Sequence, residues 1–127
     1  MDYGFSKTVD LSFEQAVDKI TEELKKEGFG ILTEIDVKET MKKKLNLDFN
    51  NYKILGACNP PIAYKALQIE EKLGLLLPCN VIVYEKDKEC IVSIFNPMII
   101  PQIIDNIELL EIAKEVKQKL LNVLERV

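Results

Sequence analysis

The 127-residue sequence contains no histidine and no tryptophan. Without histidine, the chain has no Ser-His-Asp or Cys-His catalytic arrangement, no imidazole metal ligand and no phosphohistidine. With no tryptophan, and with 17 basic against 21 acidic residues, it also lacks the basic surface with interleaved aromatic side chains that binds nucleic acid. The net charge of −4 supplies no polybasic patch for a membrane surface.

Cysteine is scarce, with only three residues in the chain. An odd number at this low density is unlike a secreted disulfide scaffold, so a reducing cytoplasm is the simpler interpretation. The first seven residues contain an early acid and no apolar core, and no signal peptide is predicted. The most apolar stretch, 91–104, is interrupted by Ser93, Asn96, Pro97 and Pro101 and is too short to span a bilayer. We therefore expect a cytoplasmic protein without a membrane segment.

The remaining composition is that of a soluble globular protein, with 47% hydrophobic and 30% charged residues. The length corresponds to one domain. No Gly/Ser-rich or Pro-rich linker, no repeat and no low-complexity tract divides the chain. We therefore expect a single compact α+β domain over residues 1–127.

Apolar periodicity and helix-capping residues predict the element order β-α-β-α-β-α-β-β-α. The expected strands cover residues 3–9, 29–37, 52–57, 80–85 and 90–95. The expected helices begin at the capping signals Ser12, Asp36 and Asp105 and after Pro60. Because a hairpin through residues 86–88 joins the last two strands, we expect a mixed or antiparallel sheet with helices packed against it.

Two of these elements allow finer predictions. The strand at 29–37 is expected to alternate regularly, with one side formed by Ile31, Thr33, Ile35 and Val37 and the other by Leu32, Glu34 and Asp36. The carboxylates on the second side are interpreted as an ordinary solvent face rather than as an acid–base pair. The last helix has a wide apolar stripe formed by Leu109, Ile112, Ala113, Val116, Leu120, Val123 and Val127, and widened by Leu110, Leu121 and Leu124. A stripe of this width is expected to contact more than one surface.

Two of the cysteines lie at the ends of expected elements. Cys58 comes just before a helix expected over Pro61–Leu73 and ended by Gly74, and Cys79 follows Pro78 at the start of a strand. A helix N-terminus can lower the pKa of a thiol, so a reactive thiol, a thiol pair or a soft-metal site is one interpretation. The other is two small buried residues, because free cysteine is among the most buried residue types. Cys90 lies inside a strand and is interpreted as core.

Other chemistry at this position is limited by what surrounds the thiols. Two thiols are half of a tetrahedral zinc site, no histidine can complete it, and no C-x-x-C motif is present. We therefore predict no metal site within one chain. Phosphate binding at a helix N-terminus needs free backbone N–H groups, and Pro60 and Pro61 supply none.

The segment 96–104 is strongly apolar and flanked by prolines. It is therefore neither a good strand nor a good helix throughout, and something must cover it. Packing over the chain's own core, a subunit interface and the wall of a ligand pocket are the three interpretations that remain open.

Two stretches, 56–67 and 74–85, contain a two-part pattern, Cys58-Asn59-Pro60 and Leu77-Pro78-Cys79. Together with the early helix, Gly-Phe and strand pattern from Ser12 to Asp36, they resemble the family of domains of unknown function numbered 302. The resemblance covers nearly the whole chain and implies a compact α+β domain found in bacteria and archaea, which forms a dimer. Because the family has no assigned activity, the resemblance implies no substrate and no catalytic residue.

The function that we predict is binding of a small ligand or a partner by a homodimer, without demonstrated catalysis. The expected site is where Cys58, Asn59 and Pro60 meet Pro78 and Cys79, since one helix links the strands that carry these two segments. We expect no nucleic-acid partner and no membrane partner. Whether the protein is an enzyme, and which cofactor it would use, are left open.

Two alternatives are kept. The first is a thiol-dependent function in redox sensing, sulfur handling or soft-metal binding through Cys58 and Cys79, which requires an accessible thiol with a depressed pKa. The second is a purely structural interaction domain, which would present a large apolar face from Met98 to Ile104 and along the last helix.

Overall fold

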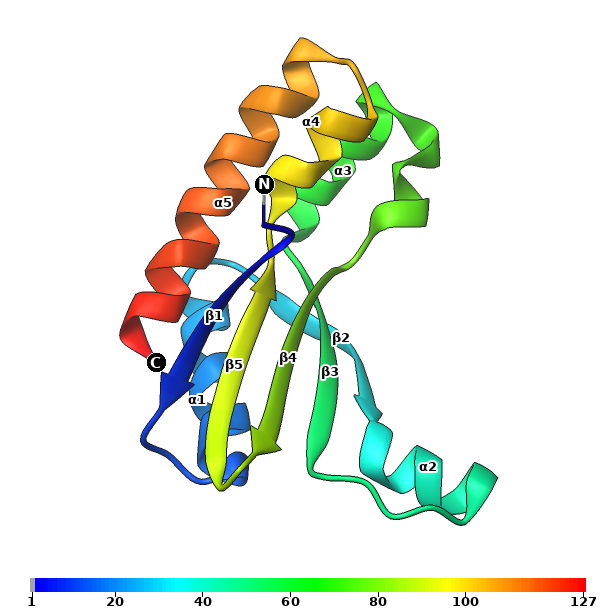
Figure 1. Ribbon diagram of the computed structural model, residues 1–127. Helices are drawn as coiled ribbons and strands as arrows, with labels where there is room; N and C mark the ends of the chain where they lie inside the picture. Colours follow the sequence, from blue (N-terminus) through cyan, green and yellow to red (C-terminus); the bar gives the residue numbers. More distant parts are fainter. Residues whose placement is uncertain (1) are drawn as a thin grey trace.

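Five antiparallel strands form one sheet in the computed structural model, which describes residues 2–127 (Figure 1). The strands are β1 (Gly4–Val9), β2 (Gly30–Asp36), β3 (Tyr52–Cys58), β4 (Cys79–Lys86) and β5 (Glu89–Phe95). Their spatial order is β1-β5-β4-β3-β2, and each neighbouring pair is antiparallel. The α+β class and the antiparallel form of the predicted sheet are confirmed.

Helices cover one face of this sheet and extend beyond both of its ends. They are α1 (Phe13–Lys26), α2 (Val37–Leu45), α3 (Pro60–Ile69), α4 (Ile100–Ile103) and α5 (Ile107–Arg126), with 3-10 helices η1 (Glu71–Leu76) and η2 (Pro97–Ile99). In Figure 1, α1 lies behind the strands, α3 and α4 lie beyond their upper end, and α2 projects at the lower right. The predicted order of the main elements is confirmed, and the additional elements are short.

Local capping explains where the helices begin. The predicted capping box of α1 is present: Ser12 Oγ accepts from the Gln15 N–H and Gln15 Oε1 accepts from the Ser12 N–H, both at 3.1 Å. The predicted cap Asp36 accepts from the Glu39 N–H at the start of α2. For α5 the cap is Asn106 rather than the predicted Asp105, because the Asn106 side chain accepts from two backbone N–H groups of the first turn.

The predicted bounds of the third helix were wrong at both ends. It begins at Pro60 rather than Pro61, because Asn59 is the residue with extended backbone and caps the helix. It ends at Ile69 rather than Leu73, because Glu70 takes an extended conformation and its side chain caps the 3-10 helix η1. Gly74, the predicted stop, lies inside η1.

The predicted regular alternation of β2 was also wrong. Ile31 pairs with Ala57 and Thr33 pairs with Gly56, so Leu32 is an extra residue in the ladder. This bulge places Ile31 and Thr33 on opposite faces of the sheet. It also leaves the Leu32 side chain 65% exposed, beside the candidate site described below.

The core lies between the sheet and the helices α1 and α5. Val81 and Val83 of β4 and Val92 of β5 are fully buried on the helix-covered face of the sheet. The predicted apolar stripe of α5 is confirmed over most of its length, with buried side chains at Leu109, Ile112, Ala113, Val116, Leu120, Val123 and Leu124. Val127, Leu110 and Leu121 are half-buried. Each fully buried aliphatic side chain contributes about 1.5–3 kcal/mol relative to exposure.

Charged groups fasten the C-terminal end of α5 to its neighbours. Glu23 of α1 is 1% exposed and accepts from Lys26 at 2.7 Å and from Arg126 Nε at 3.3 Å. Lys7 of β1 donates to the Leu124 and Val127 carbonyl oxygens, at 3.2 and 2.8 Å. Such a lysine satisfies carbonyl groups that have no partner inside the helix.

Candidate functional site

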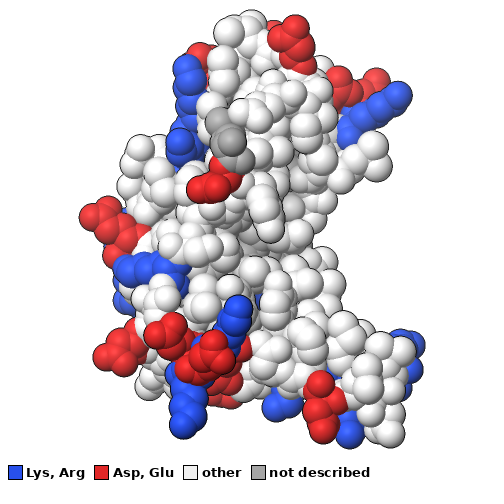
Figure 2. Space-filling model, viewed as in Figure 1, with Lys and Arg blue, Asp and Glu red and all other residues white. Residues whose placement is uncertain are grey.

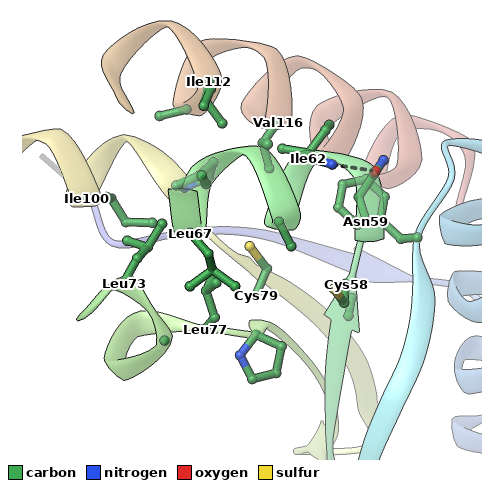
Figure 3. Close-up of a pocket in the computed structure, with 18 of the residues that line it drawn as sticks. Cys58, Asn59, Ile62, Leu67, Leu73, Leu77, Cys79, Ile100, Ile112 and Val116 are labelled. Atoms are coloured by element: carbon green, nitrogen blue, oxygen red, sulfur yellow. Dashed lines mark hydrogen bonds between the residues drawn. The ribbon is translucent and has the colours of Figure 1, made fainter. Parts of the chain in front are cut away.

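A cavity of about 320 Å³ lies beyond the upper end of the sheet (Figure 3). Its walls come from the ends of β3 and β4, from α3 and η1, from the segment at 97–100, and from the N-terminal half of α5. In Figure 3, Ile112 and Val116 of α5 face Leu67, Leu73 and Leu77 across this space. No charged residue lines the cavity.

Four of the five predicted site residues line this cavity: Cys58, Asn59, Pro78 and Cys79. The two segments meet because β3 pairs with β4, in a register that sets Ala57 opposite Cys79. The predicted proximity of the two segments is therefore confirmed. Pro60 is exposed at the first position of α3 and does not line the cavity.

The backbone at this point is closely packed. A Cβ atom on Gly56 would collide with Thr33 Oγ1 and with Pro78 Cγ, so only glycine lets β2, β3 and the segment before β4 come together. Gly28, at φ +88°, lies beneath Asn59, and a Cβ there would come within 3.0 Å of Asn59 Nδ2. These contacts position the two motif segments side by side.

Asn59 has the one amide side chain in the cavity wall, and the fold itself uses both of its polar atoms. Oδ1 accepts from the Ile62 N–H at 3.4 Å, as the N-cap of α3, and Nδ2 donates to the Glu27 carbonyl at 3.3 Å. The side chain thereby ties the start of α3 to the end of α1. Its arrangement is that of a structural cap rather than of a group waiting for a ligand.

The two thiols at the cavity are free. Because Ala57 is the register partner of Cys79, Cys58 is the next residue along β3, and successive side chains of a strand point to opposite faces. In Figure 3 the Cys79 sulfur points up towards α3. The strand register thus does not place the two sulfurs directly opposite one another.

Burial makes these thiols weaker acids. It raises the pKa of Cys79 to about 11, with a smaller contribution from a charge on Cys58, and burial also raises the pKa of Cys58. The position of Cys58 just before a helix N-terminus had suggested a lowered thiol pKa instead. Cys90 is 5% exposed, and burial followed by the charges of Glu85 and Glu14 raises its pKa as well.

The carboxylates Glu34 and Asp36 have structural partners. Glu34 forms an ion pair with Lys53 at 2.8 Å, and Asp36 caps α2. Within residues 2–127 there is no group of three or more His, Cys, Asp or Glu side chains arranged to hold a metal ion. Within the same residues, no helix is both long enough and apolar enough to cross a membrane.

Most of the cavity wall was not predicted from the sequence. The segment 96–104 was interpreted as core, interface or pocket wall, and Pro97 and Ile100 do line the cavity while Ile103 is 63% exposed. The small residues Ala63 and Ala66 of α3 were missed as part of a cavity wall, because an alanine on the apolar side of a helix is compatible with close packing as well as with open space. The α5 residues were predicted to be buried, but their pattern did not show that they face a cavity.

Comparison with known proteins gives the family. The match to the family named Domain of unknown function DUF302 extends over residues 5–127, and the chain belongs to this family. A similar solved structure is the crystal structure of an uncharacterized conserved protein DUF302 from Bacillus stearothermophilus, with a TM-score of 0.92 and 28% sequence identity. The alignment covers 99% of this chain and 98% of that chain. A comparison with curated proteins finds no match.

Proposed function

We propose that this protein is a homodimeric module that binds a small molecule in the cavity between α3 and the N-terminal half of α5. The observation that carries the proposal is the cavity itself, where the two parts of the family pattern meet. Its volume of about 320 Å³ falls at the lower end of the range of small-molecule sites, roughly 300–1,000 Å³. No catalytic step is part of this proposal.

The cavity has an inner part and a mouth, as a binding site requires. Its inner wall includes buried side chains such as Ala66, Leu73 and Ile112. Its rim includes Leu32 and Leu67, which are 65% and 38% exposed. A small molecule would therefore reach the inner wall past these two leucines.

Amide NMR spectra with a mixed set of small charged and uncharged fragments test the binding proposal. We expect shifts confined to residues around the cavity in the wild type, and their loss in Ala66→Leu, which fills the cavity from α3. Lys65→Leu is the matched control, because it adds the same side chain to an exposed position of α3 outside the cavity. Absence of any shift at the cavity in the wild type would overturn the proposal.

The homodimer is the second part of the proposal, and the open face of the sheet is the surface that we assign to it. The apolar stripe of α5, one part of the apolar face suggested by the sequence, is buried within the chain. On the face of the sheet opposite α1, a row of register partners consists of Ser6, Ser93, Ile82, Ile54 and Ile35. None of these side chains is charged, and Figure 2 shows an uncharged surface over the middle of the sheet.

Sedimentation at a series of protein concentrations tests the dimer. We expect a concentration-dependent dimer that Ile82→Lys dissociates, because a charge would be buried at the centre of the open face. Ile107→Lys, at a 71% exposed position of α5, is the matched control and should leave the dimer intact. A wild-type protein that stays monomeric at micromolar concentration would remove this part of the proposal.

The thiol-dependent function stays the second candidate, because Cys58 and Cys79 both reach the cavity. It requires a depressed thiol pKa, whereas burial raises the pKa of both residues. The three free cysteines support our further proposal that the protein resides in a reducing cytoplasm. We also propose that the chain is a single domain and that its source is a prokaryote, as for the similar Bacillus stearothermophilus protein.

A further inference from the structure

We infer that the ligand of this cavity is an uncharged, apolar molecule of about the size of two aromatic rings or a ten-carbon chain. The inference rests on the proposed binding function and specifies the chemistry of the ligand. It is carried by the lining residues, by the hydrogen bonds around them and by the cavity volume.

The lining residues exclude a charged ligand. None of them is Lys, Arg, Asp or Glu, so an ionic group inside the cavity would lose its hydration without gaining an opposite charge. Burying an unpaired ion in a protein is strongly unfavourable. The buried Cys79 thiol adds only a weak donor at the cavity, and its raised pKa keeps it protonated near neutral pH.

The start of α3, beside the cavity, offers no anion site. The helix α3 begins beside the cavity, but Pro60 and Pro61 occupy its first two positions and have no N–H group. The next two N–H groups are already used, since that of Ile62 donates to Asn59 Oδ1 and that of Ala63 to the Asn59 carbonyl. A carboxylate or a phosphate therefore finds no free donor at this helix N-terminus.

Polar side chains of the interior are likewise satisfied. Among residues 2–127, no buried side-chain nitrogen or oxygen atom lacks a hydrogen-bond partner. The Asn59 amide, the one such group in the cavity wall, bonds to the backbone at both ends. A ligand with several hydrogen-bonding groups would thus leave those groups unpaired, which disfavours sugars, nucleotides and amino acids.

The volume sets the size of the ligand. A cavity of about 150 Å³ lined by aliphatic side chains holds one benzene molecule. The cavity here has about 320 Å³, which corresponds to roughly two such rings or to a chain with a similar number of atoms. An uncharged two-ring aromatic molecule and a ten-carbon alcohol both match this space.

Fluorescence titration with 1-naphthylamine, a two-ring probe that is uncharged at neutral pH, tests the inference. We expect saturable binding to the wild type and to Lys65→Leu, and loss of binding in Ala66→Leu. If Ala66→Leu does not fold, Ala63→Leu fills the same cavity from a half-buried position of α3. Circular dichroism of each variant establishes whether it is folded.

Displacement of the bound probe then separates the ligand classes. 1-Decanol, decanoate and decylammonium each contain ten carbon atoms and differ in the head group. The alcohol is used below its solubility limit and the two ions below their critical micelle concentrations. We expect 1-decanol to displace the probe, and each ion to require at least about a tenfold higher concentration, because burying its charge is unfavourable.

The contrary outcomes are distinguishable. Equal displacement by an ion would overturn the uncharged class, while the binding function would stand. The same conclusion would follow if neither the probe nor 1-decanol bound, while charged fragments still shifted the NMR signals of the cavity residues. Equal probe binding to Ala66→Leu and to the wild type would place the probe outside the cavity and overturn the inference. No fragment shift and no probe binding would remove the proposed function itself.

Discussion

The two halves of α5 present one continuous apolar stripe to two different surroundings. In the C-terminal half, Leu120 and Val123 are fully buried and belong to the core formed with α1 and the sheet. In the N-terminal half, Ile112 and Val116 have the same kind of side chain but line a cavity opposite α3. An amphipathic pattern therefore predicts which side of a helix is covered, and not whether the covering elements fill the space.

The neighbours of the two halves explain this difference. The helix α1 has 14 residues and supplies large side chains such as Ile20 and Leu24, and Glu23 fastens it to Arg126 at the end of α5. The helix α3 has 10 residues and presents the small side chains of Ala63 and Ala66 to α5. Large side chains and an ion pair therefore fix the C-terminal half of α5, which we call the packed end. The small side chains of α3 leave the cavity beside the N-terminal half, which we call the cavity end.

The largest expected effect comes from shortening one buried side chain in each half of α5. Leu120→Ala should destabilise the protein by about 4 kcal/mol, because it opens a void in a filled core. Ile112→Ala should cost about 2 kcal/mol, since its side chain already borders empty space and has fewer contacts to lose. Urea unfolding of the two variants measures the difference. An equal or a larger cost for Ile112→Ala would contradict the comparison.

Replacing an alanine by leucine in α1, which packs on the C-terminal half of α5, and in α3, which faces its N-terminal half, should change the free energy of unfolding in opposite directions. Ala16 is fully buried in α1, and Ala16→Leu should cost about 1–3 kcal/mol by overpacking the filled end. Ala66→Leu should stabilise the free protein by about 0.5–1 kcal/mol, because it fills apolar space. Thermal unfolding of both variants gives the signs, and destabilisation of similar size in both would show that no usable space exists beside Ala66.

Acid should lower the stability of the protein through Glu23, which lies at the packed end. The hydrogen bond from Lys26 is the largest of the influences that hold the pKa of Glu23 below its usual 4.5. A carboxyl whose pKa is lower in the folded state stabilises the fold above its unfolded pKa, and this contribution is lost as the pH falls through the folded pKa. We therefore expect the urea midpoint to fall below about pH 4.5, and to fall less in Glu23→Gln. Equal pH dependence of the two proteins would exclude this role of Glu23.

The smallest effect concerns the accessibility of the cavity end. Half-buried Cys58 should react with iodoacetamide before Cys79 and Cys90, and all three thiols should react slowly at pH 7 because burial raises their pKa values. The rates should rise with pH as the thiolate fraction increases. Saturation with 1-decanol should slow the labelling of Cys79 but not of Cys90, as mass spectrometry of the labelled peptides would show. Rapid labelling of Cys79 at pH 7 would favour the thiol-dependent function instead.

Sequence reasoning was most successful where a local interaction decides the structure. The capping box of Ser12 and Gln15, the cap Asp36 and the hairpin before Cys90 each depend on residues that are neighbours in the chain. The hairpin turn is built from Asp87 and Lys88, both with positive φ, as a two-residue turn of type I′ requires.

The predictions from the sequence that were wrong failed because the structure there depends on residues distant in the chain. The bulge at Leu32 depends on how β2 pairs with β3 beside Gly56, and no periodicity within β2 alone reveals it. The early end of α3 depends on Glu70 turning away to cap η1. The meeting of Cys58 and Cys79 was predicted from chain connectivity, but the cavity around them depends on volumes supplied by α3, η1 and α5 together.

The most direct test of the account is a crystal structure determined under xenon pressure. Xenon enters apolar cavities that contain no ordered water, and its position is visible without any assumption about the natural ligand. We predict xenon between α3 and the N-terminal half of α5, in the space bordered by Ala66, Ile112 and Cys79. Side chains or ordered water filling that space, with no xenon bound there, would contradict the claim that this end of α5 is open to an apolar guest.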